Sequence, residues 1–192
     1  MILYLNGSPR LKKANSNSFL KDINATDIEY LYKDNFDDIL KDINNTHTIV
    51  FSFPLYADSP PSRVIEFMEY IESNKIDISD RNIYTIINCG FLESKHNNTA
   101  SLIMENFSSN NKAIYKGTFN IGAGEIIGKR NNNFLFRLIS IPYKFKIKKF
   151  SRYIFNKKVI NISTTLQGFT KHLYMFIVNK SFKSTMKKNN CI

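Results

Sequence analysis

The sequence begins Met1-Ile-Leu-Tyr-Leu-Asn-Gly-Ser-Pro-Arg10 and soon continues with Asn15-Ser-Asn-Ser18. The opening apolar run stops at the Asn-Gly-Ser-Pro step, and small hydroxyl and amide side chains follow before the chain turns apolar again. This order predicts a buried parallel strand, a loop and a helix start. In an open α/β sheet the first strand is central, and ligands bind beyond the carboxyl ends of strands, where helix N-termini present free N–H groups. We therefore predict an anion-binding loop at residues 6–18.

Length and composition predict one globular domain, residues 1–192. Of the 192 residues, 43% are hydrophobic and 22% are charged, which suffices for a core without disulfides or metals. Cys89 and Cys191 are far apart and match no ligand spacing, so we expect neither a disulfide framework nor a metal site. The N-terminus has no basic leader, and no apolar run reaches the roughly 18 residues of a membrane span, so the predicted location is cytoplasmic.

The charge is distributed very unevenly. Residues 1–125 contain 12 Lys/Arg and all 16 Asp/Glu, a net charge of −4, whereas residues 126–192 contain 15 Lys/Arg and no acid, a net charge of +15. Such a basic segment is typical of a solvated face, but it also suits a nucleic acid, an anionic membrane surface or a phosphorylated ligand. The sequence leaves these alternatives open, with the solvated face favoured.

The apolar pattern predicts a parallel sheet with helices on both faces. Five runs have strand character: residues 2–5, 27–32, 48–53, 82–87 and 113–121. Helices are expected between them, at 17–23, at 37–43, after Ser62 as an N-cap, and at 97–110 with Leu102, Ile103 and Phe107 facing inward. Residues 122–125 are expected to form a loop. Right-handed crossovers are expected, and in the strand order 2-1-3-4-5 the third strand lies beside the first, across the topological switch point.

The basic part, residues 126–192, is predicted to be a mostly helical extension that packs on the core formed by residues 1–125. A helix is expected at 134–141, where Pro142 stops it, and a second, basic and amphipathic helix at 143–155. The tail at 172–188 has the spacing of a helix packing onto the sheet, with four apolar residues facing inward: Leu173, Phe176, Ile177 and Phe182.

Three loops follow strands one, three and four, and together they predict a mononucleotide site. The first supplies donors for a phosphate: Ser8, Arg10, Ser16, Asn17 and Ser18. The second and third flank a planar ring: Pro54, Leu55 and Tyr56, then Asn88, Cys89, Gly90 and Phe91. Each loop alone also reads as an ordinary turn or helix cap, so their agreement carries the prediction. Cys89 is expected to be a buried small hydrophobe and no nucleophile.

Three motifs make the resemblance specific: Asn6-Gly-Ser-Pro-Arg10 with Ser16-Asn-Ser18, Phe53-Pro-Leu-Tyr56 with Asp58 and Pro61, and Asn88-Cys-Gly-Phe91 with Glu93. They resemble the flavodoxin-like NAD(P)H-dependent FMN reductase and quinone reductase family. The resemblance implies a three-layer sandwich with a five-stranded parallel sheet, FMN with its phosphate on the first loop and its ring between the other two, and a homodimer. One departure is the first helix, because only eight residues separate Ser18 from Asp27.

The resulting hypothesis is an FMN-dependent oxidoreductase that transfers two electrons from NADH or NADPH to a quinone, a flavin or another small acceptor. The flavin carries the chemistry, so no catalytic side chain is required. One alternative is an electron carrier, although such carriers usually present an acidic face and this chain is basic. The other is a non-enzymatic module that binds a membrane surface or nucleic acid through the interleaved aromatic and basic residues at 143–153.

Overall fold

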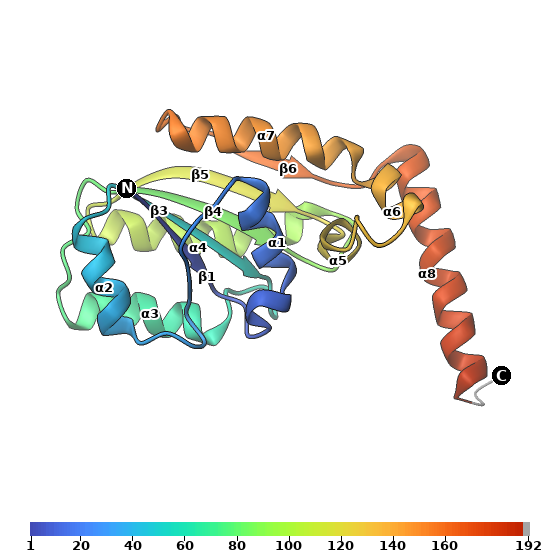
Figure 1. Cartoon of the computed structure of the whole chain (residues 1–192), viewed down its shortest axis with the longest axis horizontal. Helices are drawn as coiled ribbons and strands as arrows, with labels where there is room; N and C mark the ends of the chain where they lie inside the picture. Colours follow the sequence, from blue (N-terminus) through green and yellow to red (C-terminus); the bar gives the residue numbers. More distant parts are fainter. Residues whose placement is uncertain (190–192) are drawn as a thin grey trace.

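A parallel sheet forms the middle of the molecule in the computed structural model, which describes residues 1–189 (Figure 1). Its strands lie in the order β2-β1-β3-β4-β5-β6, and all neighbours are parallel. The strands are β1 (Ile2–Asn6), β2 (Ile28–Tyr30), β3 (Thr48–Pro54), β4 (Asn82–Asn88), β5 (Ile114–Ile121) and β6 (Ile162–Thr164). The α/β class and the order 2-1-3-4-5 are confirmed. Cys191 lies outside the described residues.

The prediction of five strands was wrong, because β6 extends the sheet beyond β5. Three residues are too few to show an alternating pattern, which is why the sequence does not reveal this strand. Gly117 lets the two segments approach: its φ is +122°, and a Cβ there would lie 2.1 Å from the carbonyl oxygen of Ile160. The Asn161 side chain completes the junction by accepting a hydrogen bond from the Thr118 amide at 3.0 Å.

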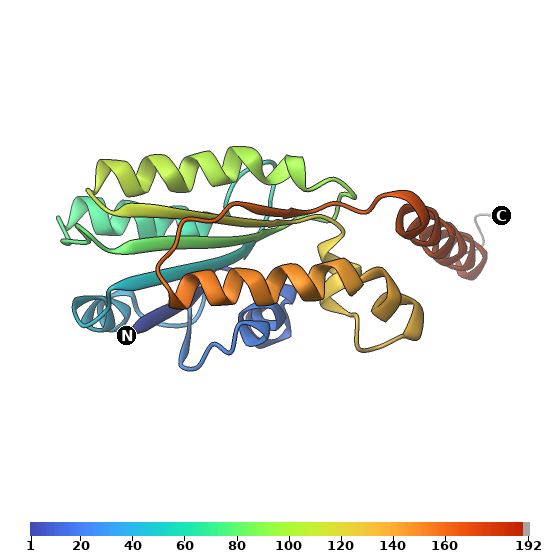
Figure 2. The same ribbon diagram turned by 90° about the horizontal axis from the view of Figure 1, so that it is seen from above.

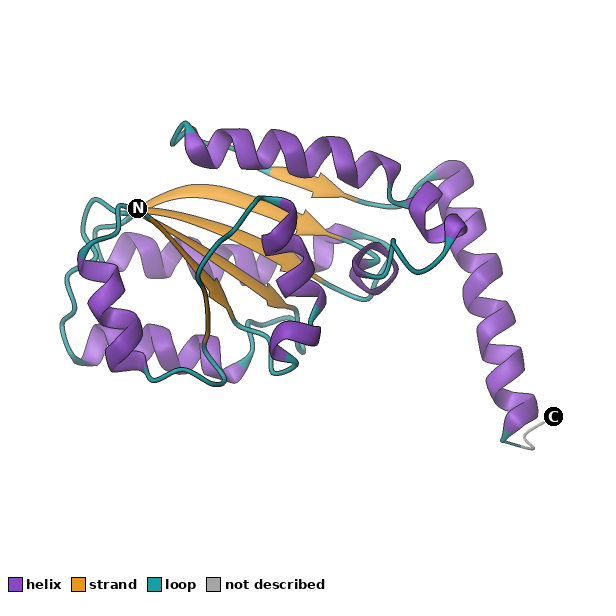
Figure 3. Cartoon of the chain, viewed as in Figure 1, coloured by secondary structure: helices purple, strands orange, loops and turns teal. Residues whose placement is uncertain are grey.

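Helices cover both faces of the sheet, as predicted (Figure 3). They are α1 (Asn15–Asp22), α2 (Phe36–Asn44), α3 (Ser62–Ser73), α4 (Asn98–Asn110), α5 (Gly124–Gly128), α6 (Phe134–Ile139), α7 (Ile141–Phe155) and α8 (Gly168–Lys188), with 3-10 turns at Leu11–Lys13 and Ser94–Asn97. Figure 2 shows α4 and α7 on opposite sides of the sheet. The result is a three-layer sandwich.

Two apolar clusters fill the spaces between these layers. One buries side chains of α2, α3 and α4, such as Ile39, Phe67 and Met104, against one face of the sheet. The other buries side chains of α1 and α7, such as Phe19 and Phe150, against the opposite face. Short as it is, α1 buries Phe19 and Leu20 completely. Hydrophobic burial therefore holds α1 in place even though the helix has only eight residues.

Two details of α3 and α4 differ from expectation. Ser62 is the first residue of α3 and not its N-cap. Pro61 occupies the cap position, and its side chain has no atom that could accept a hydrogen bond from the first amides of the helix. In α4 the buried positions are Ala100, Met104 and Phe107, whereas Leu102 is 57% exposed. Residues four and seven positions apart share one helix face, and Leu102 lies on another, so the inward face was assigned wrongly at that residue.

The segment from 122 to 142 is more helical than predicted. Residues 124–128 form the short helix α5, so the expected loop is confined to the turn after β5, where Ala123 adopts a left-handed conformation. Pro142 lies in the first turn of α7, where its missing N–H costs no hydrogen bond. It therefore helps to begin α7, directly after α6 ends at Ile139.

Helix α8 does not pack onto the sheet, contrary to expectation. Figures 1 and 2 show it projecting from the end of the body. Its first half is anchored by Leu173 and Ile177, which pack against a small cluster that includes Ile126, while Phe176 is 63% and Phe182 66% exposed. The sheet face is already covered by α7, which leaves α8 no place on it. Within residues 1–189, no helix combines the length and apolar content needed to cross a lipid bilayer.

Candidate functional site

A cavity of about 220 Å³ opens beyond the carboxyl ends of β1, β3 and β4. This is the point where the strand order reverses, because β1 lies between β2 and β3. Its wall consists of the loop after β1 and the start of α1, the loops after β3 and β4, and α5. The lining residues are Ser8, Arg10, Ala14, Asn15, Ser16, Pro54, Leu55, Tyr56, Asn88, Cys89, Gly90 and Glu125.

The loop after β1 is held tightly. Gly7 sits where a Cβ would lie 2.3 Å from the Val64 side chain, so the chain can pass α3 only as glycine. The Gly7 amide donates to the Ser52 carbonyl at 2.9 Å, and the Ser8 amide donates to the Asn6 side chain at the same distance. These bonds turn the chain sharply after the strand and place Ser8, only 2% exposed, at the bottom of the cavity.

The start of α1 provides hydrogen-bond donors to this cavity. Its N-cap is Ala14, which has no side chain that could satisfy the first amides of the helix. Ser16, 1% exposed, is fixed in place because its carbonyl accepts a hydrogen bond from the Ser52 hydroxyl at 3.1 Å. Arg10 contributes a positive charge at the same wall. An uncapped helix start with buried hydroxyls and an arginine suits an anion of phosphate size.

Asn88 joins the ends of two strands and the start of a helix. Its side-chain nitrogen donates to the Ser16 hydroxyl and to the Phe53 carbonyl, both at 3.0 Å, and the residue is 5% exposed. Its own carbonyl accepts from the Leu55 amide at 2.7 Å. One buried amide side chain thus connects the end of β4 with β3 and with the start of α1.

The outer part of the cavity is flatter and less polar. Tyr56, 46% exposed, begins a tight turn in which Ala57 and Asp58 both adopt left-handed conformations and Tyr56 and Ser59 exchange backbone hydrogen bonds. Gly90 lines the same cavity, and a Cβ there would meet no atom within 4 Å. An exposed aromatic ring and an open glycine in one cavity wall leave room for a planar group.

Cys89 is buried, as predicted. It is 5% exposed, and burial raises the pKa of its thiol. The sulfur lies 3.7 Å from three carbonyl oxygens, those of Phe91, Glu93 and Ile121. A protonated thiol in these surroundings is a packing group and no nucleophile.

Three of the twelve predicted site residues have side chains that do not line the cavity. Asn17 bonds to the Lys12 carbonyl at 3.1 Å and to the Tyr30 hydroxyl at 2.8 Å. The Ser18 hydroxyl accepts from Arg130, and the Phe91 ring packs against His96 with 4.3 Å between centroids. On α1, successive residues point in different directions, so Ser16 reaches the cavity whereas Asn17 and Ser18 do not.

Ala14, Asn15 and Glu125 line the cavity but were missed. Glu125 comes from α5, and its carboxylate accepts a hydrogen bond from Lys129 at 2.7 Å. That bond and the charge of Lys129 lower the pKa of Glu125, so the group is ionised at neutral pH. The available signal was its position at the carboxyl end of the fifth strand, the sheet edge where the other three loops meet.

A polar cavity at the switch point of a sheet ordered 2-1-3-4-5 defines a flavodoxin-like α/β protein. No protein-family model and no curated protein sequence matches the chain. Solved structures do match it in fold. An NADPH-quinone reductase from P. pentosaceus is 12% identical over 80% of this chain and 97% of its own, with a TM-score of 0.56.

Two further structures have the same arrangement. The NAD(P)H:quinone oxidoreductase from Methanothermobacter marburgensis is 12% identical over 80% of this chain and 95% of its own, with a TM-score of 0.55. The Trp repressor binding protein from Bacillus subtilis is 19% identical over 64% of this chain and 84% of its own, also with a TM-score of 0.55. At these identities the similarity establishes the flavodoxin-like fold, which this chain shares with NAD(P)H quinone reductases.

Proposed function

We propose that the protein is an FMN-dependent oxidoreductase that passes two electrons from NADH or NADPH to a quinone, a flavin or another small acceptor. The observation that carries the proposal is the cavity itself. Buried Ser8 and Ser16, the uncapped start of α1 and Arg10 converge at the switch point of the sheet, with the Tyr56 turn and Gly90 beside them. The donor set suits a phosphate, and the flatter outer part suits a ring.

In this proposal the phosphate binds to the hydroxyls of Ser8 and Ser16 and to the first amides of α1, with Arg10 adding charge. Asn17 contributes through its backbone amide, because its side chain is engaged elsewhere. The Ser18 amide already donates to the Ala14 carbonyl at 3.3 Å, and its hydroxyl accepts from Arg130, so Ser18 only helps to hold the start of α1. The ring lies along Pro54, Leu55 and Tyr56, with Gly90 on the other side. Asn88 holds the ends of β3 and β4 and the start of α1 together beneath it.

A bound flavin supplies the hydride chemistry. The residues of this chain bind and orient it, and the buried edge near Asn88 and Cys89 excludes water from that side. No side-chain base is needed. Glu125 lines the same cavity and is ionised, so it compensates part of the Arg10 charge before a phosphate binds. The nicotinamide and the acceptor then approach from the open side, where Tyr56 is exposed.

We also propose a homodimer, since α8 presents Phe176 and Phe182 to solvent at 63% and 66% exposure. Large exposed apolar side chains on a projecting helix favour association with a second copy.

The decisive experiment is a visible absorption spectrum of the purified full chain, followed by titration with FMN. We expect flavin bands, saturable FMN uptake, oxidation of NADH or NADPH with a quinone as acceptor, and a light-scattering mass of twice 22.3 kDa. A colourless protein that takes up no FMN would contradict the proposal. Flavin that is reduced in two well-separated one-electron steps, without NAD(P)H turnover, would favour an electron carrier instead.

The phosphate assignment has its own test in the variant Arg10→Glu. Reversing this charge is expected to weaken FMN binding by about tenfold or more, because two charges about 4 Å apart interact by about 1–4 kcal/mol at a protein surface. Binding of riboflavin, which lacks the phosphate, is expected to stay unchanged. Lys13→Glu is the matched control, since Lys13 is exposed in the same loop but does not line the cavity. Equal losses for FMN and riboflavin would place the phosphate elsewhere.

A further inference from the structure

Helix α7 has two faces of different character. The inner face packs on the sheet through side chains that are at most 3% exposed: Tyr143, Ile147, Phe150 and Ile154. The opposite face carries a line of residues at helical spacing that we name the outer stripe: Ile141, Phe145, Lys148, Arg152 and Phe155. Lys144 and Lys149 flank the stripe and are exposed.

The outer stripe is neither a core face nor an ordinary solvated one. Phe145 is 73%, Phe155 56% and Ile141 45% exposed, although a helix face turned to water is normally polar. Cations separate these apolar residues, and residues 126–192 contain no acidic side chain that could neutralise them. Apolar side chains alternating with Lys and Arg on one helix face are typical of helices that lie in the interface of an anionic bilayer.

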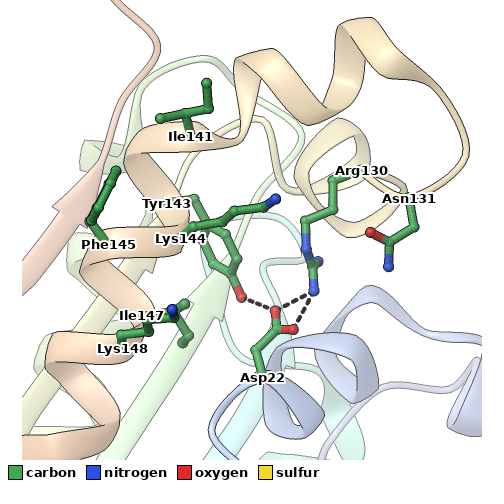
Figure 4. Close-up of a pocket in the computed structure, with 9 residues that line it drawn as sticks. All are labelled: Asp22, Arg130, Asn131, Ile141, Tyr143, Lys144, Phe145, Ile147 and Lys148. Carbon is green, nitrogen blue, oxygen red and sulfur yellow. Dashed lines mark hydrogen bonds and ion pairs between the residues drawn. The ribbon is translucent and has the colours of Figure 1, made fainter.

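A cavity of about 500 Å³ adjoins the stripe, and Ile141, Lys144, Phe145 and Lys148 line it (Figure 4). At its inner end Asp22 accepts hydrogen bonds from Arg130 and Tyr143, so the arginine charge is already compensated. Among the described residues, neither Lys144 nor Lys148 forms an ion pair. Two uncompensated ammonium groups at an apolar opening suit the phosphate of a lipid headgroup.

We propose that the outer stripe of α7 docks on the surface of anionic phospholipid bilayers, with a headgroup phosphate held between Lys144 and Lys148. Phe145, Phe155 and Ile141 then enter the acyl boundary, and the cations face the anionic headgroups. Charge complementarity argues for this occupant, because the segment is purely basic. A nucleic acid is less well matched. Base stacking requires aromatic rings along a groove, whereas the outer stripe is the outward face of a single helix and begins with the aliphatic Ile141.

The test is co-sedimentation of the full chain with vesicles, and it needs no flavin. We expect binding to vesicles with about one-third phosphatidylglycerol in phosphatidylcholine and much weaker binding to pure phosphatidylcholine. Raising the salt from about 0.1 M to about 1 M shortens the Debye length from about 10 Å to about 3 Å and is expected to weaken binding strongly. Equal binding to both vesicle types, or none to the anionic ones at low salt, would overturn the proposal.

Two variants separate its electrostatic and apolar parts. Lys144→Gln with Lys148→Gln is expected to lower partitioning about 30-fold, at about one kcal/mol for each cation at the surface. Phe145→Ser is expected to lower it about tenfold while leaving the salt dependence in place. All three side chains are exposed, so folding is expected to be unaffected, and circular dichroism checks this.

The matched control is Lys75→Gln with Lys112→Gln, which removes two exposed lysines after α3 and α4, on the other side of the sheet. The control is expected to bind like the unmodified protein. If the control lost vesicle binding to the same extent, the effect would depend on net charge alone, and the assignment to α7 would be overturned. Parallel titration with a single-stranded oligonucleotide decides the alternative, because tight binding to it without vesicle binding would identify nucleic acid as the partner.

Discussion

Replacing Asp22 with alanine is expected to lower the free energy of unfolding by about 3–5 kcal/mol. Asp22 lies at the end of α1, and its carboxylate accepts hydrogen bonds from the Arg130 guanidinium and the Tyr143 hydroxyl (Figure 4). The Arg130 side chain is only 7% exposed. Without Asp22 the guanidinium keeps its charge but loses the group that compensates its burial. Urea denaturation followed by circular dichroism measures the change.

Two comparisons make this result specific. Asp38→Ala removes an ion pair with Lys41 whose side chains are 68% and 76% exposed, and we expect a loss of less than about 1 kcal/mol. Adding Arg130→Met to Asp22→Ala is expected to recover part of the stability, because the unpaired charge is then gone. A loss below about 1 kcal/mol for Asp22→Ala alone would show that water compensates Arg130 in the folded protein.

The second large effect is expected for Asn88→Asp. The substitution changes the shape very little but replaces the nitrogen that donates to the Ser16 hydroxyl and the Phe53 carbonyl. A carboxylate oxygen would face the Phe53 carbonyl without a proton between them. We expect a loss of about 3 kcal/mol of unfolding free energy near pH 7, and FMN binding weaker by about tenfold or more because the new charge repels the phosphate.

The pH dependence of Asn88→Asp follows from burial of the new carboxyl group. Burial raises its pKa in the folded state above the unfolded value, so folding takes up a proton. The deficit against the unmodified protein is therefore expected to be largest above the folded-state pKa and to shrink as the pH falls toward about 4. Asn74→Asp, at an exposed helix end, is the control and is expected to change stability by about 0.5 kcal/mol at most. A deficit independent of pH would show that the carboxyl group is not buried.

The central sheet was predictable because its strands are unusually clear. β3 and β4 are buried on both faces, so they appear as continuous apolar runs that no surface helix would have. Helices between such strands favour right-handed crossovers, and the order 2-1-3-4-5 is one of the doubly wound orders that these allow. By contrast, β6 depends on the close approach of Ile160 to Gly117 and on the hydrogen bond from the Thr118 amide to Asn161, which are long-range contacts without a local pattern.

The sequence predicted which loops form the candidate site better than it predicted which side chains line it. Ser8, Tyr56 and Asn88 follow three adjacent strands, and topology alone brings them to one edge. Which α1 side chains face that edge depends on the rotation of the helix, and Ser18 points instead toward Arg130. The position of Glu125 in the cavity wall depends on α5, a short helix with glycine at both ends that has no clear helical pattern in the sequence. Whether these residues bind FMN stays a prediction.

Helix α1 has eight residues and is therefore only about 12 Å long. Ser16, in its first turn, lines the cavity beneath the sheet edge, and Asp22, its last residue, closes the cavity beside α7. The proposed flavin site and the proposed lipid site are thus neighbouring cavities that share α1 as part of their walls. Opposite ends of one short helix border both cavities, so a bilayer docked on α7 would place a membrane-soluble acceptor such as a quinone close to the proposed flavin site.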